Sequence, residues 1–571
     1  MSRSRLLLSI VIAGLLPAGS ALAQWTTDKI NCENPYSPIP CLDRRFHQSF
    51  DPEYAGKYIG HDEPGVNFYS DVPGSGNYSR YRVILPRDPQ KFPTAANLQG
   101  TGGPTVWNFQ LYWAFWFGMA LCDSEAYPAY THECPADSDE NIFADADPKS
   151  PKYIGHHPGT GVAEVFFEPP GYGNIAGFVN ATKWTVLLGI GSFYARDPGP
   201  TGSLFAGGSG GVLNNAACQN TAGAGLNLAL LTLDGIAQAP GDSLNTDPNK
   251  LAVIDGRTLQ MNSGDDVLVT LHDTAEGFQV VVEDLTTHQT GSMTASVANG
   301  FTQLVFDPTA TTCASRPYAF HPMYSTSSPE TFIPWAAKTS NVAMTVEIGH
   351  FSYCSAQDNS VAPGIGICLA SPVAHEFDPV TGLHETDDQY CVDAASSLTN
   401  GSLGPLGGCT DSDVDWDGLS YRHAWPGSGR DAYGFSALPE PIRFTSPKFM
   451  PSGSGSGPLK SYARAAFETN VASNEDLSYC PYSGGPGCVM PPPGALFYPL
   501  FTTTMKEDRC WWQLGGASIA GTTNTFGGTA ATEFNTQEFL LDIAGTTANP
   551  GSTTQIGDFY RLLPSDPCAS D

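Results

Sequence analysis

The stretch DVLVTLHDTAEGFQVVVEDL, residues 266–285, decides the fold class. Apolar and polar residues largely alternate on both sides of DTAEG at 273–277, which is the pattern of β-strands with one buried face. A short polar segment that ends in glycine is typical of a hairpin turn. The sequence therefore predicts a hairpin of strands 266–272 and 278–285, with Asp273 starting the turn through a side chain to backbone bond.

Segments of similar texture occur elsewhere and predict further strands. One of them, GVAEVFFE at 161–168, ends at Pro169-Pro170, because proline cannot donate to a strand ladder. The chain holds 61 glycines and 46 prolines but only 15% charged residues, a balance that disfavours helices. We therefore predict a mostly β protein, a β-sandwich of jelly-roll type. The other expected strands lie at 78–85, 107–121, 226–233 and 342–348.

The texture of the chain changes near residue 356. Residues 355–410 are loop-like and hold three closely spaced cysteines. We predict an N-terminal β-sandwich domain at 24–355 and a C-terminal disulfide-rich β domain at 356–571. Strands suggested at 442–444 and 463–467 could equally be the remaining strands of one large sandwich, so both arrangements stay open at this point.

The first residues carry the pattern of an export signal. A basic start is followed by an apolar run at 6–16 and by an A-x-A sequence at 21–23. These features predict a secretory signal peptide at 1–23. The apolar run is too short for a bilayer, which needs roughly 20 residues. We therefore expect a secreted, extracellular protein without a membrane span.

The cysteine content supports the same compartment. An even count of 14 cysteines in an exported chain indicates disulfide bonds, since the space outside the cell is oxidising. Nearest-neighbour pairing predicts long bridges at Cys218–Cys313 and Cys510–Cys568, although spacing alone does not fix the connectivity. Zinc binding is disfavoured because no C-x2-C pair occurs. The predicted short pairs are Cys32–Cys41, Cys122–Cys134, Cys354–Cys368, Cys391–Cys409 and Cys480–Cys488.

The acidic balance of the chain limits its partners. Acidic side chains number 57 against 27 basic ones, which gives a formal charge of -30. Such a surface repels phosphate backbones and anionic membranes, so nucleic acid is disfavoured as a partner. Neutral or cationic partners fit better, although a role in solubility alone also explains the charge.

Two glutamates on the predicted strand 161–168 are the first candidates for catalysis. Residues at i, i+2 and i+4 share a face, so Glu164, Phe166 and Glu168 are expected to project together. An aromatic ring can stack on a pyranose while two carboxylates act as nucleophile and acid/base. The spacing is similar to that of sandwich-fold retaining glycosidases, except that Phe166 replaces their middle aspartate. Exposed carboxylates on a strand are also common without any function.

Histidines supply further candidates. His156 and His157, just upstream of that strand, could act as a general base or as metal ligands. His272 and Asp273 at the hairpin, with Glu276, form a second His/carboxylate group. Surface or structurally bonded histidines are the alternative in both places.

The sequence DVDWDG is a candidate calcium loop. Asp413, Asp415 and Asp417 alternate before a glycine, as they do at the opening of an EF-hand loop. Position 12 of such a loop is here Ala424 instead of a bidentate glutamate, so a later ligand would come from elsewhere. We expect structural Ca2+ at this loop, with plain turn-forming acids as the alternative, and no organic cofactor.

Four segments of the sequence together carry a resemblance to other proteins. They are FWFGMALCDS at 115–124, VLVTLHDTAEGFQVVVEDLTTHQTGSMTAS at 267–296, FHPMYSTSS at 320–328 and DVDWDGLSYRHAWPG at 413–427. The set resembles a group of large secreted β-rich proteins from actinomycetes and filamentous fungi. The resemblance runs over most of the mature chain and implies one extracellular architecture across both halves. It carries over no catalytic residue.

Taken with export and the β fold, these candidates favour a secreted carbohydrate-active enzyme, a glycoside hydrolase or polysaccharide lyase that acts on extracellular glycan. Glu164 would be its main acid/base residue, with Glu168 as partner and His156 or His157 as a further base. A non-catalytic glycan-binding protein of the cell surface is the first alternative. An acid-stable glutamic peptidase of β-sandwich type is the second.

Overall fold

The structure is a computed structural model, and it describes part of the chain. The described residues are 65–69, 75–87, 106–107, 115–123, 160–170, 182–192, 195–196, 212–213, 215–219, 225–244, 251–305, 309–322, 335–338, 351–353, 357–362, 365–368, 389–392, 408–411, 440, 442–450, 457–462, 464–471, 501–514, 539–544, 553–562 and 565–570.

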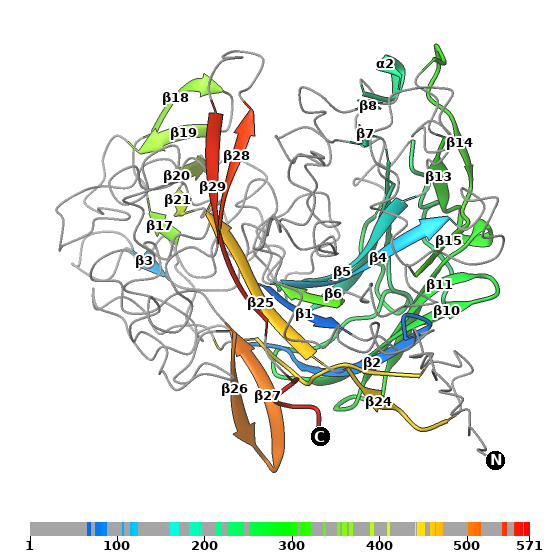
Figure 1. Ribbon diagram of the computed structural model, residues 1–571, viewed down its shortest axis with the longest axis vertical. Coiled ribbons are helices and arrows are strands. Elements are labelled where there is room, and N and C mark those ends of the chain that lie inside the picture. The colour runs from blue at the N-terminus through cyan, green and yellow to red at the C-terminus, as the bar shows by residue number, and fades with distance from the viewer. Residues whose placement is uncertain are drawn as a thin grey trace, which may run out of the picture.

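The larger of two main sheets has ten antiparallel strands (Figure 1). Their order is β28 (Phe539–Ala544), β29 (Thr553–Leu562), β25 (Arg464–Val471), β1 (Gly65–Tyr69), β16 (Trp335–Lys338), β4 (Phe115–Asp123), β5 (Thr160–Glu168), β6 (Thr185–Ser192) and β9 (Leu226–Leu230), with β15 (Phe320–Pro322) also beside β4.

The second main sheet has nine strands. Their order is β12 (Thr290–Ala295), β11 (Gly277–Asp284), β10 (Asp266–Thr274), β2 (Tyr78–Ile84), β22 (Arg443–Phe444), β27 (Arg509–Leu514) and β26 (Phe501–Lys506), with β23 (Lys448–Phe449) beside β2 and β24 (Lys460–Ser461) beside β23.

Smaller elements complete the described fold. A six-stranded sheet holds β18 (Gln357–Ala362), β19 (Ile365–Cys368), β20 (Gln389–Val392), β21 (Gly408–Asp411), β17 (Phe351–Tyr353) and β3 (Val106–Trp107). Two strand pairs are β13 (Thr302–Leu304) with β14 (Ser315–Pro317), and β7 (Ala195–Arg196) with β8 (Val212–Leu213). Helical turns occur at α2 (Ala216–Gln219) and Val297–Asn299, and none of the described helices is long and apolar enough to cross a membrane.

The two main sheets pack face to face around an aromatic core. Tyr81 of β2 lies 4.7 Å from Phe117 of β4, and Phe68 of β1 lies 5.6 Å from Trp512 of β27, between ring centroids. All four side chains are at most 2% exposed, and burial of such large rings is the strongest single contribution to the stability of a core. The predicted mostly β sandwich is therefore confirmed.

The central hairpin is confirmed, but its turn is tighter than predicted. Thr274 of β10 is the register partner of Gly277 of β11, so Ala275 and Glu276 alone form the turn. The Thr274 hydroxyl donates to the Gly277 carbonyl at 2.7 Å and accepts from the Glu276 N–H at 3.3 Å. The prediction that Asp273 starts the turn is wrong, because Asp273 lies within the strand.

The remaining strand predictions have mixed outcomes. Strands predicted at 78–85, 161–168 and 226–233 are observed as β2, β5 and β9. The strand predicted at 107–121 overlaps β4, which begins only at Phe115 and continues to Asp123. The segment 355–410 is not only loop, since four short strands, β18 to β21, lie within it. The strand predicted at 342–348 lies outside the described residues.

Each main sheet joins strands from both sides of residue 356. β25 pairs with β1 through five register partners, and β22 and β23 pair with β2. Figure 1 shows β25, β28 and β29 continuing the sheet that holds β1. This pairing favours the alternative in which the C-terminal strands complete one sandwich, and the division into two domains stays a prediction.

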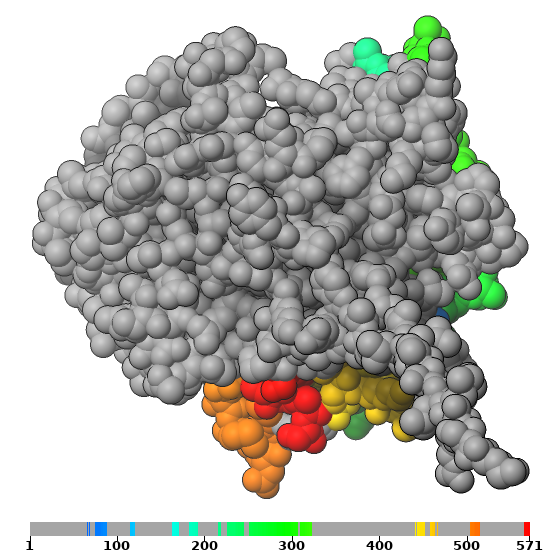
Figure 2. Space-filling view, viewed as in Figure 1, coloured from blue at the N-terminus to red at the C-terminus, as the bar shows by residue number. Residues whose placement is uncertain are grey.

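Two predicted disulfides are confirmed, Cys218–Cys313 and Cys510–Cys568. The second ties the C-terminal residues to β27, and Figure 2 shows that end against the β26–β27 hairpin. Cys391 and Cys409 are register partners in β20 and β21, which places their backbones opposite each other. Their bond and the other short pairs stay predictions.

Candidate functional site

Glu164 lies between two glycines on the face of β5 that points away from the second sheet. Its register partners are Gly118 of β4 and Gly189 of β6, and its side chain is half-buried. A Cβ at Gly118 would lie 2.4 Å from the Trp116 ring, and one at Gly189 would lie 2.9 Å from the Phe166 ring. The glycines therefore make room for two rings beside the carboxylate.

These rings belong to a buried cluster and present no open stacking surface. Trp116 is 4% exposed and Phe166 is 2% exposed. They pack in a core beneath the segment that contains Leu251, together with Leu187, Leu228 and Leu230. The expectation that Phe166 would stack on a sugar is therefore wrong.

Glu168 lies on the same strand as Glu164 but is fully buried. β5 pairs with β4 and β6 without a register shift, so no bulge brings the two glutamates closer. Their Cα atoms are then about 13 Å apart along the strand, with Phe166 between them. Glu168 is therefore closed off from solvent, and its partnership with Glu164 stays a prediction.

Several predicted site residues lie outside the described part of the chain. They are His156 and His157, and the candidate calcium ligands Asp413, Asp415 and Asp417. Among the described residues, no group of three His, Cys, Asp or Glu side chains is placed to hold a metal ion.

An ion pair that the sequence did not predict joins the two sheets. The Nδ1 atom of His321 in β15 lies 3.1 Å from each carboxylate oxygen of Asp273 in β10. The His321 side chain is 42% exposed and that of Asp273 is 17% exposed. The bond to Asp273 raises the pKa of His321 above 6.5, although burial acts in the opposite direction. A carboxylate thus orients an imidazole that solvent can reach, as general acid–base catalysis requires.

A buried phenol lies close to this pair. Burial, and then the charge of Asp273, raises the pKa of Tyr318 well above 10.0, so its hydroxyl stays protonated at neutral pH. That hydroxyl is buried and has no hydrogen-bond partner within the described part of the chain. Phe301 and Phe320 hold the ring, at centroid distances of 6.2 and 5.6 Å. The phenol is therefore a neutral, buried neighbour of the pair.

The predicted group of His272, Asp273 and Glu276 is not assembled as such. His272 projects beside Tyr78, with ring centroids 5.3 Å apart, and Glu276 lies in the hairpin turn. Asp273 instead reaches His321, which lies 48 residues further along the chain. The prediction paired Asp273 with its sequence neighbour His272, and no local sequence pattern indicates the contact with His321.

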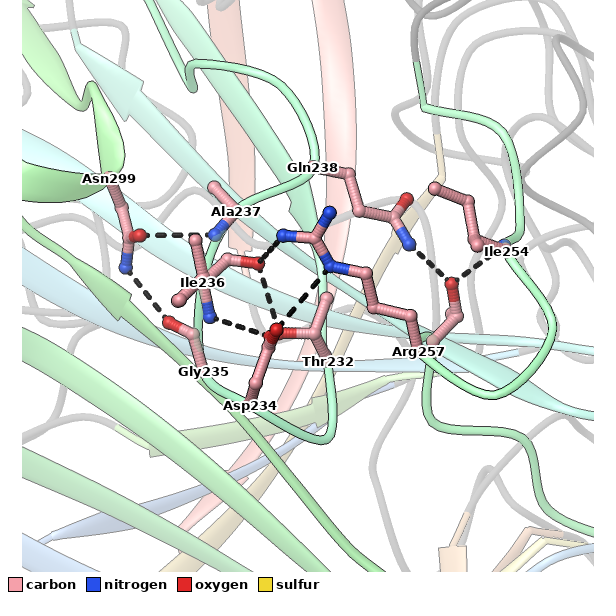
Figure 3. A network of polar contacts seen from close by, with 10 residues as sticks. Thr232, Asp234, Gly235, Ile236, Ala237, Gln238, Ile254, Arg257 and Asn299 are labelled. Atoms are coloured by element: carbon pink, nitrogen blue, oxygen red, sulfur yellow. Dashed lines mark hydrogen bonds and ion pairs between the residues drawn. The ribbon is translucent and has the colours of Figure 1, made fainter.

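A second polar network braces a loop and serves the fold. Arg257 lies 3.5 Å from the Asp234 carboxylate and donates to the Ile236 carbonyl at 3.4 Å (Figure 3). The amide of Asn299 accepts from Ala237 N–H and donates to the Gly235 carbonyl. Most partners are backbone groups, so the network satisfies a loop that lacks a strand neighbour.

Comparison with known proteins adds little to this geometry. No family model and no curated protein matches the chain. A solved structure of an alginate lyase from Klebsiella pneumoniae is similar over 51% of this chain and 63% of that chain, with 10% identity and a TM-score of 0.13. The chain thus spans just under two thirds of that structure's length. So distant a likeness carries no argument about activity.

Proposed function

We propose that the protein is a secreted carbohydrate-active enzyme, a hydrolase or lyase acting on extracellular glycan, with His321 and Asp273 as its proton-transfer pair. The observation that carries the proposal is the half-exposed imidazole of His321 bonded through Nδ1 to Asp273. The predicted export signal and the disulfide-bonded sandwich support the proposal, because both fit a protein that works outside the cell.

The geometry defines what the pair would do. With Nδ1 donating to Asp273, Nε2 is the acceptor nitrogen of the neutral ring. Neutral His321 would take a proton from water in hydrolysis, or from a sugar carbon in elimination. Asp273 would stabilise the imidazolium that forms. Glu164, half-buried and on the larger sheet, stays the second candidate acid.

A product screen tests this function. The secreted, oxidised protein is incubated with neutral and charged polysaccharides and with denatured casein, with calcium or with EDTA. New reducing ends would indicate hydrolysis, and unsaturated sugar would indicate elimination. His321→Gln is expected to lower kcat/KM by roughly 100-fold or more, the usual contribution of an acid–base residue. His272→Gln, which changes a histidine in edge-on contact with Tyr78, is the matched control and should keep activity.

The pH profile separates catalysis from a structural role. Since Asp273 raises the pKa of His321, Asp273→Asn should lower that pKa and move the acidic limb of kcat/KM to lower pH. Full activity in His321→Gln would overturn the assignment, and Glu164→Gln would then be the decisive variant. Peptide release without sugar product would favour the peptidase, and binding without product would favour the glycan-binding protein.

A further inference from the structure

Lys183 and Asn262 meet where the chain enters β6. The preceding and following residues fix this meeting, because Trp184 and Met261 form an antiparallel bridge with N–H to carbonyl distances of 2.9 and 3.0 Å. Residues one step outside such a bridge face each other across the two chains. The Nζ atom of Lys183 accordingly donates to Oδ1 of Asn262.

A buried carboxyl group holds the other side of the same amide. Oδ2 of Asp265 accepts from the side-chain Nδ2 of Asn262 at 3.0 Å and from its backbone N–H at 2.6 Å. The Asp265 side chain is only 4% exposed. The Asn262 amide is therefore clamped, with a primary amine at its oxygen and a carboxyl group at its nitrogen.

A second carboxyl group makes Asp265 able to carry a proton. Burial, followed by the neighbouring Asp284, raises the pKa of Asp265. Asp284 is 1% exposed and its oxygens accept from the Thr286 N–H and from the Thr287 N–H and hydroxyl. The raised pKa of Asp265 and its bonds to Asn262 make it the carboxyl group placed to exchange a proton with this amide.

We propose that Lys183 and Asn262 become joined by an intramolecular amide bond, with Asp265 as the proton-transfer residue. The Lys183 ammonium loses a proton to water, and its Nζ attacks Cγ of Asn262. Protonated Asp265, which contacts Nδ2, gives its proton to the departing Nδ2. The Cγ–Nδ2 bond breaks as the Cγ–Nζ bond forms, the nitrogen leaves as ammonia, and the second proton that the lysine nitrogen loses returns to Asp265. No oxidant or co-reactant is needed.

The surroundings favour the reaction by holding both partners in place. Trp184 and Met261 are fully buried, and Nε1 of Trp184 donates to the Ser263 hydroxyl at 3.0 Å. Fixed partners can react at effective concentrations far above those in solution. The bond would close a loop of 79 residues and tie β6 of the larger sheet to the segment that leads into β10 of the second sheet. Like a disulfide it would restrain the unfolded chain, but reducing agents would not break it.

Mass spectrometry of the reduced, full-length secreted protein tests the proposal. The expected mass is that of the processed sequence less one ammonia, and a proteolytic digest should contain one branched peptide that joins Lys183 to Asn262. Trypsin should no longer cleave after Lys183. A mass without this loss, with both residues in linear peptides, would overturn the proposal. So would conversion of Asn262 to aspartate without a branch.

Variants distinguish proton transfer by Asp265 from mere contact between Lys183 and Asn262. Asn262→Ala and Lys183→Arg should show no loss of ammonia. Asp265→Asn should keep the amine and the amide in contact but leave them unjoined. The matched control is Asp255→Asn, which alters a carboxylate of the same segment that accepts a hydrogen bond from Gln260. In this control, Lys183 and Asn262 should be joined as fully as in the unchanged protein. Complete joining in Asp265→Asn would overturn the role of Asp265. If Asp265→Asn fails to fold, the mass of the unchanged protein still decides whether the bond exists.

Discussion

At the residue scale, side chains in this protein find partners far along the chain. Asp273 bonds to a histidine 48 residues away, and Lys183 bonds to an amide 79 residues away. Turn residues and strand periodicity are local signals. They placed Asp273 next to a turn, but they do not indicate which distant side chain it contacts. The sequence therefore indicated which residue types were candidates, but not that Asp273 and His321 lie together.

Asp566 offers a test of a single buried charge. Its Oδ1 atom accepts from the Ser446 hydroxyl at 2.7 Å and from the Cys568 N–H at 2.9 Å, while Oδ2 is buried without a partner in the described structure. Burial dominates over these bonds and raises the pKa of Asp566 from 3.8 to about 6. The native state therefore binds the proton more tightly than the unfolded state does.

The sign of the pH effect follows from this shift. The stabilising contribution of protonated Asp566 is fully present below pH 3.8 and is lost as the pH rises through about 6. We expect the free energy of unfolding to fall by about 3 kcal/mol from this group across that window. Asp566→Asn, which does not titrate, should remove the fall. Urea unfolding at a series of pH values measures it, and an unchanged pH slope in Asp566→Asn would contradict the assignment.

At the scale of elements, strands with a clear alternation were predictable, whereas others were missed even where they are long, as is β29 with ten residues. β10 and β11 hold nine and eight residues, so the alternation of buried and half-buried side chains repeats often enough to be recognised. Strands such as β20 and β21 hold four residues each, and four residues carry too few repeats to be distinguished from loop. Their pairing depends on partners that are distant in sequence.

The β10–β11 turn depends on one glycine. Gly277 has a φ of +140°, and a Cβ there would lie 2.0 Å from the backbone oxygen of Ala295 in β12. Gly277→Ala should therefore lower the free energy of unfolding by about 2 to 4 kcal/mol, through backbone strain and overlap with a backbone atom. Gly256→Ala is the matched control, since its φ is +75° but the space around it is open.

The comparison of the two glycines isolates the steric part. Gly256→Ala should lose only about 1 to 2 kcal/mol, the cost of the left-handed backbone alone. Chemical denaturation of both variants gives the two values. Equal losses would mean that the hairpin moves away from β12 without cost, and that Gly277 is needed only for its φ.

At the scale of the whole molecule, both main sheets combine strands from the two halves of the chain. The boundary near residue 356 was placed on a change of composition, which reports on local texture and not on pairing. β1 and β2 are completed by β25, β22 and β23, all of which follow that boundary. Backbone bonds and the aromatic core therefore cross between the halves.

The Cys510–Cys568 disulfide tests whether the sandwich unfolds as one unit. Its loop spans 58 residues, and removal of the bond in Cys510→Ser/Cys568→Ser should lower the free energy of unfolding by roughly 4 kcal/mol through the greater entropy of the unfolded chain. Hydrogen exchange measured by mass spectrometry follows β2 and β27 separately. Because β22 pairs with both strands, the double variant should lose protection in both together. Loss confined to β27, with β2 unchanged, would show instead that the C-terminal strands open independently and would support a separate C-terminal domain.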